Sequence, residues 1–93
     1  MIVSFRHGGL EELFHYGRSK RINQNLKKRI CYLLDMLAAA TKPEDMQSTP
    51  GIHLHRLKGA RKNQWSVAVN GPWRITFEFK DGHIHQVDLE QYH

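Results

Sequence analysis

Two parts of the sequence gather residue types that can bind or cleave a phosphodiester. The segment HRLKGARK, residues 55–62, contains one histidine and four cationic side chains, and Arg74 follows within an alternating apolar stretch. Tyr92 and His93 add two more groups at the end of the sequence. Histidine and tyrosine can transfer or orient protons, whereas lysine and arginine stabilise negative charge on phosphate oxygens. These residue types point to chemistry on nucleic acid.

The types of residue that are absent narrow this chemistry. The sequence has no Gly-rich phosphate loop, no Ser/His/Asp pattern and no carboxylate cluster that would hold Mg²⁺. Phosphodiester cleavage by this chain would therefore proceed without a metal or another cofactor. RNA suits such a reaction because it carries its own nucleophile, the 2′-hydroxyl. Cleavage then needs a base, an acid and cations around the phosphate.

Other interpretations of the same residues remain open. The 55–62 segment could be a solvated charged loop, and Arg74 could be a surface arginine paired with Glu78 or Asp88. Two His-x-His pairs, one at 53–55 and one at 83–85, could hold a metal if the two imidazoles of each pair share one side of a strand. No Cys–His or His–Glu framework completes such a site.

Composition predicts one small, soluble domain over residues 1–93. Apolar residues make up 40% of the chain and charged residues 25%, which is typical of a globular protein. Fourteen Lys and Arg against nine Asp and Glu give a net charge of +5, which favours polyanionic partners. The single cysteine, Cys31, excludes an internal disulfide. The sequence lacks a signal peptide and an apolar run of membrane-spanning length, so we expect a cytoplasmic protein with no membrane partner.

The first half of the chain predicts a short strand and two helices. The strand covers Ile2 to Phe5, and a first helix around Leu10 to Phe14 ends at Gly17. The second helix follows Ser19 as its cap and ends before Pro43, after which residues 43–46 can form one further turn. Its apolar stripe recurs every three or four residues and consists of Ile22, Leu26, Ile30, Leu33 and Leu37.

From Ile52 onward the apolar period changes to two, which predicts antiparallel strands. Asn70-Gly71 marks a hairpin that Pro72 should lengthen, and Asp81-Gly82 marks another. In the last strand, Ile84 is out of phase with Val87 and Leu89, which either a bulge or a kink at the start of the strand would explain.

The elements together predict an α+β fold of order β-α-α-β-β-β-β. It consists mostly of antiparallel sheet, with two helices packed on the face that bears Trp73, Ile75, Phe77 and Phe79. By alternation, Arg74 and Thr76 should point to the opposite face, toward solvent.

The chain also resembles a known family, the HigB-type toxins of bacterial type II toxin–antitoxin systems, within the RelE/ParE superfamily. The matching stretches are MIVSFRHGGLEELF, LHRLKGARKNQWSV, GPWRITFEF and LEQYH, which occur in the family's order over essentially the whole chain. This resemblance implies a RelE-like fold and a ribosome-dependent mRNA endonuclease that inhibits translation. It also implies a bacterial, cytoplasmic protein with a HigA-type helix-turn-helix antitoxin as its partner. The toxin itself would reach operator DNA only through its complex with that antitoxin.

The resemblance assigns roles to individual residues. The family's active-site residues fall on His55, Lys58, Arg74 and Tyr92, with His93 beside the tyrosine. His55 or His93 would transfer protons, and Tyr92 would stack on a base or orient the phosphate. Further cations would grip the backbone of messenger or ribosomal RNA: Arg56, Arg61 and Lys62.

Two other functions compete with the nuclease. The superfamily also contains ParE-like gyrase inhibitors, which share the fold but would not need the residues that align with the nuclease active site. A plain basic module that binds RNA or DNA would lose affinity gradually on charge reversal, with no single essential residue.

Overall fold

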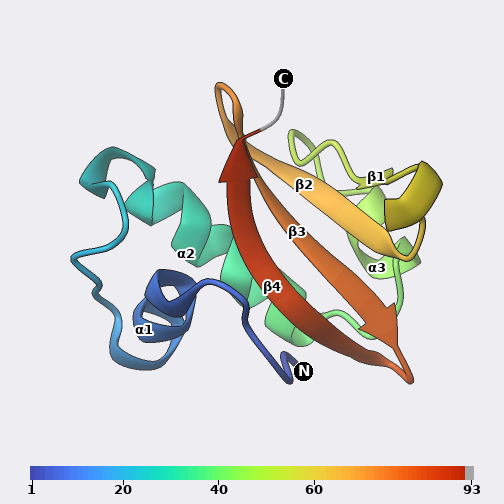
Figure 1. The fold of residues 1–93 in the computed structure, drawn as a ribbon, viewed down its shortest axis with the longest axis horizontal. Coiled ribbons are helices and arrows are strands. Elements are labelled where there is room, and N and C mark those ends of the chain that lie inside the picture. Colours follow the sequence, from blue (N-terminus) through green and yellow to red (C-terminus); the bar gives the residue numbers. More distant parts are fainter. Residues whose placement is uncertain (92–93) are drawn as a thin grey trace.

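The computed structural model describes residues 1–91 and places helices on one face of a four-stranded antiparallel sheet (Figure 1). The helices on that face are α1 (Gly8–Tyr16), α2 (Gln24–Ala39) and α3 (Glu44–Gln47), and a separate 3₁₀ helix, η1 (Gly59–Arg61), joins the first two strands. The strands are β1 (His55–Arg56), β2 (Gln64–Asn70), β3 (Trp73–Lys80) and β4 (His83–Gln91), in the sheet order β1-β2-β3-β4. The predicted α+β class and the packing of helices on one face are confirmed.

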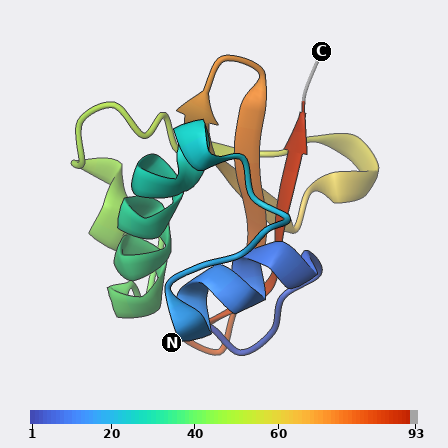
Figure 2. The same cartoon turned by 90° about the vertical axis from the view of Figure 1, so that its left-hand side faces the viewer.

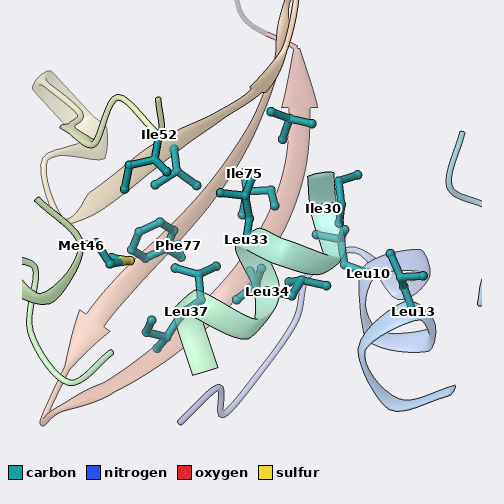
Figure 3. Packing of buried hydrophobic residues seen from close by; sticks show 14 of the residues in the cluster. Leu10, Leu13, Ile30, Leu33, Leu34, Leu37, Met46, Ile52, Ile75 and Phe77 are labelled. Atoms are coloured by element: carbon teal, nitrogen blue, oxygen red, sulfur yellow. The ribbon is translucent and has the colours of Figure 1, made fainter. Parts of the chain in front are cut away.

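Helix α2 forms the centre of the core, because its apolar stripe faces the sheet. Leu33, Leu34 and Leu37 are at most 1% exposed and point toward Ile75 and Phe77 of β3 (Figure 3). Two buried residues outside α2 belong to the same core, Met46 of α3 and Ile52 before β1. The further turn predicted at residues 43–46 is present as α3.

The start of α2 differs from the prediction. The N-cap is Asn23, whose Oδ1 accepts the backbone N–H of Asn25 at 2.8 Å, so the helix begins after Asn23 and not after Ser19. Ser19 instead donates its hydroxyl to Glu12 of α1 at 2.7 Å. Ile22 remains buried although it precedes the helix, which explains why it continued the apolar stripe.

Helix α1 lies beside α2 on the same side of the sheet (Figure 2). The Nδ1 atom of His7 caps its first turn by accepting the N–H of Gly9 at 3.0 Å. Gly17 ends the helix in the left-handed conformation, at φ 75°, as predicted. Within residues 1–91, none of the helices has the length and apolar character that crossing a bilayer requires.

The predicted first strand is reduced to two isolated parallel bridges with β4. Ile2 pairs with Ile84, and Phe5 pairs with Val87. Between them, the hydroxyl of Ser4 accepts the N–H of Gln86 at 2.9 Å. The segment before α1 therefore follows the outer edge of β4 without forming a continuous ladder.

A one-residue shift in the pairing of β3 with β4 shows that the bulge, of the two predicted alternatives, is present. Glu78 pairs with His85, but Thr76 pairs with Asp88, so β4 contains one extra residue in this interval. Gln86 has a φ of 57° at this point. The extra residue allows Ile84 and Val87, which are three positions apart, both to be buried.

The two hairpins also test the predicted turns. Asp81 and Gly82 both have positive φ and join Lys80 to His83 in a two-residue turn, as expected. The longer turn predicted at Pro72 is wrong, because Asn70 pairs directly with Trp73. A register shift between Ala68 and Asn70 accommodates this tighter connection.

We expect Leu33→Ala to destabilise the fold by about 2–5 kcal/mol, because it opens a cavity between α2 and β3. Lys28→Ala, at an exposed position of the same helix, should change the free energy of unfolding by less than about 0.5 kcal/mol. Urea denaturation of both variants measures the difference. Equal effects of the two substitutions would contradict this packing.

Candidate active site

A pocket of about 460 Å³ opens on the sheet face opposite the helices. Its lining consists of His53, His55, Leu57, Ser66, Ala68 and Arg74. The pocket therefore extends from the segment that contains β1, across β2, to β3. It brings together two of the residues predicted for the site, His55 and Arg74.

Strand pairing explains why these side chains meet. His55 is opposite Ser66 on β2, and Ala68 is opposite Arg74 on β3. Side chains at directly paired positions project to the same face of a sheet. Their neighbours Val67 and Ile75 point the other way, into the core.

Arg74 is less open to solvent than predicted, since its side chain is only 19% exposed. Its Nη2 donates to Oε1 of Glu90 at 2.8 Å, and its Nε donates to the same oxygen at 3.2 Å. Glu90 stands directly opposite Arg74 in the β3–β4 ladder. The ion pair thus forms with Glu90, two residues beyond the Asp88 that the sequence suggested.

Glu90 is the centre of a larger hydrogen-bond network. It accepts both Nη groups of Arg61, each at 2.8 Å, and the hydroxyl of Thr76 at 3.2 Å. These bonds, that from Arg61 above all, lower the pKa of Glu90 to about 2. Thr76 was expected to face solvent, but it is only 2% exposed because this network covers it.

The basic segment after β1 is partly occupied by contacts within the chain. Besides Glu90, Arg61 binds the side-chain oxygen of Gln64 at 2.7 Å, so its predicted contact with RNA would have to compete with these bonds. Arg56 donates to the backbone oxygen of Lys62 at 2.8 Å and lies over the Trp65 ring. The roles of Arg56, Arg61 and Lys62 in RNA binding stay predictions.

The remaining predicted residues have different positions. Lys58 is exposed at the start of η1, next to the pocket residue Leu57, but does not itself line the pocket. Tyr92 and His93 lie outside the described residues.

Sequence reasoning missed two residues of this site. The role of Glu90 depends on the bulge in β4, so alternation alone could not assign it to Arg74. His53 lines the pocket too, and the His53–His55 spacing was its signal, but that spacing was considered only as a weak and incomplete metal-binding pattern.

The two His-x-His pairs do not come together. The first lies at the β1 edge of the sheet and the second at the start of β4, on the opposite edge. Among residues 1–91, no group of three or more His, Cys, Asp or Glu side chains is arranged to hold a metal ion.

A larger surface cavity, of about 790 Å³, lies beside the helices. It is lined by Glu12, Tyr16, Arg18, Ser19, Lys20, Arg21, Gln24 and Lys27. It contains cations but no histidine, and no predicted site residue. The His55–Arg74 pocket is therefore the candidate active site.

The low pKa of Glu90 predicts an acid-sensitive contribution to stability. A carboxylate whose pKa is lower in the folded state than in the unfolded state stabilises the fold above its unfolded pKa, near 4.5. This contribution, about 1–3 kcal/mol after allowance for partial exposure, should be lost as the pH falls from about 5 to 2. Glu90→Gln should flatten the pH dependence of the unfolding free energy in that range.

Urea denaturation at a series of pH values measures this effect. Glu11→Gln, the same change at an exposed carboxylate of α1, is the matched control and should retain the wild-type profile. A Glu90→Gln profile that overlies the wild type would show that the network adds no acid-sensitive stability.

Comparison with known proteins places the chain in a family. The family model described as "RelE-like toxin of type II toxin-antitoxin system HigB" matches residues 3–93. The chain is 37% identical to Endoribonuclease HigB of Proteus vulgaris over 93 residues, which cover both proteins completely. It is 28% identical to Toxin HigB-1 of Vibrio cholerae over 83 residues, covering 88% of this chain and 87% of that protein. This chain therefore belongs to the HigB-like toxins, the RelE-like toxins of type II toxin–antitoxin systems.

Proposed function

We propose that this chain is an endoribonuclease toxin that cleaves mRNA on the ribosome, without a metal, and so inhibits translation. The observation that carries the proposal is that His55 and Arg74 line one pocket on the sheet face opposite the helices. The full-length similarity to a protein named Endoribonuclease HigB supports the same activity.

The pocket offers groups for the steps that RNA cleavage requires. The 2′-hydroxyl of the substrate attacks the adjacent phosphate, and the guanidinium of Arg74 stabilises the negative charge that develops on the phosphate oxygens. Lys58 adds positive charge from the edge of the pocket. His55 or His93 takes the proton of the hydroxyl or protonates the 5′ leaving oxygen. Tyr92 stacks on a base or orients the phosphate.

Glu90 keeps Arg74 in position for this role. The guanidinium is held at Nε and Nη2 by one carboxylate oxygen, so its orientation is set before a substrate binds. Arg61 shares this carboxylate, and the three side chains together keep a positive charge that attracts phosphate. We also propose that Arg56 and Lys62 bind the RNA backbone further along the substrate.

The partners follow from the type of system. A type II toxin has a cognate antitoxin, and we propose a HigA-type helix-turn-helix protein that links the pair to operator DNA. The ribosome and mRNA would be the other partners, in the bacterial cytoplasm. We propose residues 1–93 as one toxin domain.

Arg74→Ala should reduce mRNA cleavage by about 100-fold or more, because it removes the main cation at the phosphate. Mapping the 5′ ends of cellular mRNA after brief induction measures this loss. Wild-type protein should produce new ends inside translated reading frames. Arg18→Ala, at an exposed arginine of the other cavity, is the matched control and should cut like the wild type.

Circular dichroism shows whether Arg74→Ala remains folded, which we expect because Arg61 and Thr76 still bind Glu90. Full cleavage by a folded Arg74→Ala protein would overturn the proposed site. Growth arrest by the wild type with intact mRNA would overturn the nuclease function and favour gyrase inhibition, which a supercoiling assay would then test.

A further inference from the structure

His53 lines the candidate active site, although the proposed mechanism does not use it. Its φ is 48°, in the left-handed region. The backbone on both sides is attached to β2: the carbonyl of Ile52 accepts the N–H of Ala68 at 2.7 Å, and His55 pairs with Ser66. The unusual conformation thus lies in a segment that is held against the sheet.

The backbone alone does not explain why a histidine occupies this position. Only a few per cent of non-glycine residues adopt positive φ, and glycine does so without steric cost. Gly51, two residues earlier, has a φ of 80°. The imidazole of His53 is exposed and forms no hydrogen bond to the rest of residues 1–91. A residue in a strained backbone conformation whose side chain forms no hydrogen bond within the fold is typical of a functional site.

The composition of the pocket indicates what this imidazole meets. Arg74 supplies the positive charge on the β3 side, where a phosphate would bind. The rest of the lining is apolar or weakly polar and includes Leu57 and Ala68 beside the two imidazoles. Flat rings of this kind stack on unpaired bases in complexes with single-stranded RNA. Phosphate and base would therefore occupy different sides of one pocket.

We propose that His53 contacts the RNA nucleobase next to the phosphate bound by Arg74, and so sets the nucleotide preference of cleavage. This inference rests on the proposed function and adds a specificity-determining residue to it. His53 and His55 both line the pocket, so base contact by His53 leaves His55 available for proton transfer.

Two substitutions remove the imidazole while keeping the backbone conformation. Glycine and asparagine both tolerate the left-handed region, so His53→Gly and His53→Asn should melt within about 5 °C of the wild type. In 5′-end mapping, both should lower cleavage at the wild-type sites by about 5- to 100-fold, as expected for a lost stacking contact. Both should also change the distribution of nucleotides at the cut.

The matched control is His83→Asn, the same change at an exposed histidine at the far end of the β3–β4 ladder, which should cut like the wild type. Unchanged cleavage and preference in the folded His53 variants would overturn the inference, even if Arg74→Ala is inactive. A uniform loss of cleavage with unchanged nucleotide preference would also overturn it. No cleavage by the wild type would overturn the proposed function itself, and the inference with it.

Discussion

The extra residue in β4 is the constraint on which the rest of the site depends. Ile84 and Val87 must both face the helices to complete the core, although they are an odd number of residues apart. Only a bulge between them lets both side chains face the core. The bulge also shifts the pairing of every later residue of β4 with β3 by one position. Glu90 consequently stands opposite Arg74, where a regular ladder would have placed Leu89. The packing of the core on one face of the sheet thus determines that Glu90 lies opposite Arg74 on the other face.

The Glu90 network shows how a small sheet can carry a cation on a largely covered face. A buried arginine without a partner would be costly, whereas a fully neutralised one would attract phosphate weakly. One carboxylate shared by Arg61 and Arg74 avoids both extremes. The bonds from Arg61 to Glu90 also attach the η1 turn to β4. The basic segment is therefore held in a fixed position relative to the pocket.

Much of this arrangement was predictable from local patterns, because periodicity reports which face of an element is buried. The stripe of α2, the Asp81-Gly82 hairpin and the projection of Arg74 away from the helices all follow from spacing. The partner of Arg74 and the burial of Thr76 do not, since they depend on register between distant strands. The start of α2 was misplaced because Ile22 is buried outside the helix and extends its pattern.

The pairing of residues 2–5 with β4 has a consequence for when the protein becomes complete. During synthesis the earliest residues leave the ribosome first, but their partners Ile84 and Val87 belong to the last described strand to be made. Glu90, which orients Arg74, belongs to the same strand. The core edge, the anchor of the first segment and the charge network therefore form together, only after β4 has been made. A nascent chain that still lacks β4 has no assembled Glu90 network, so the ribosome that makes this protein meets the assembled site only after β4 has emerged.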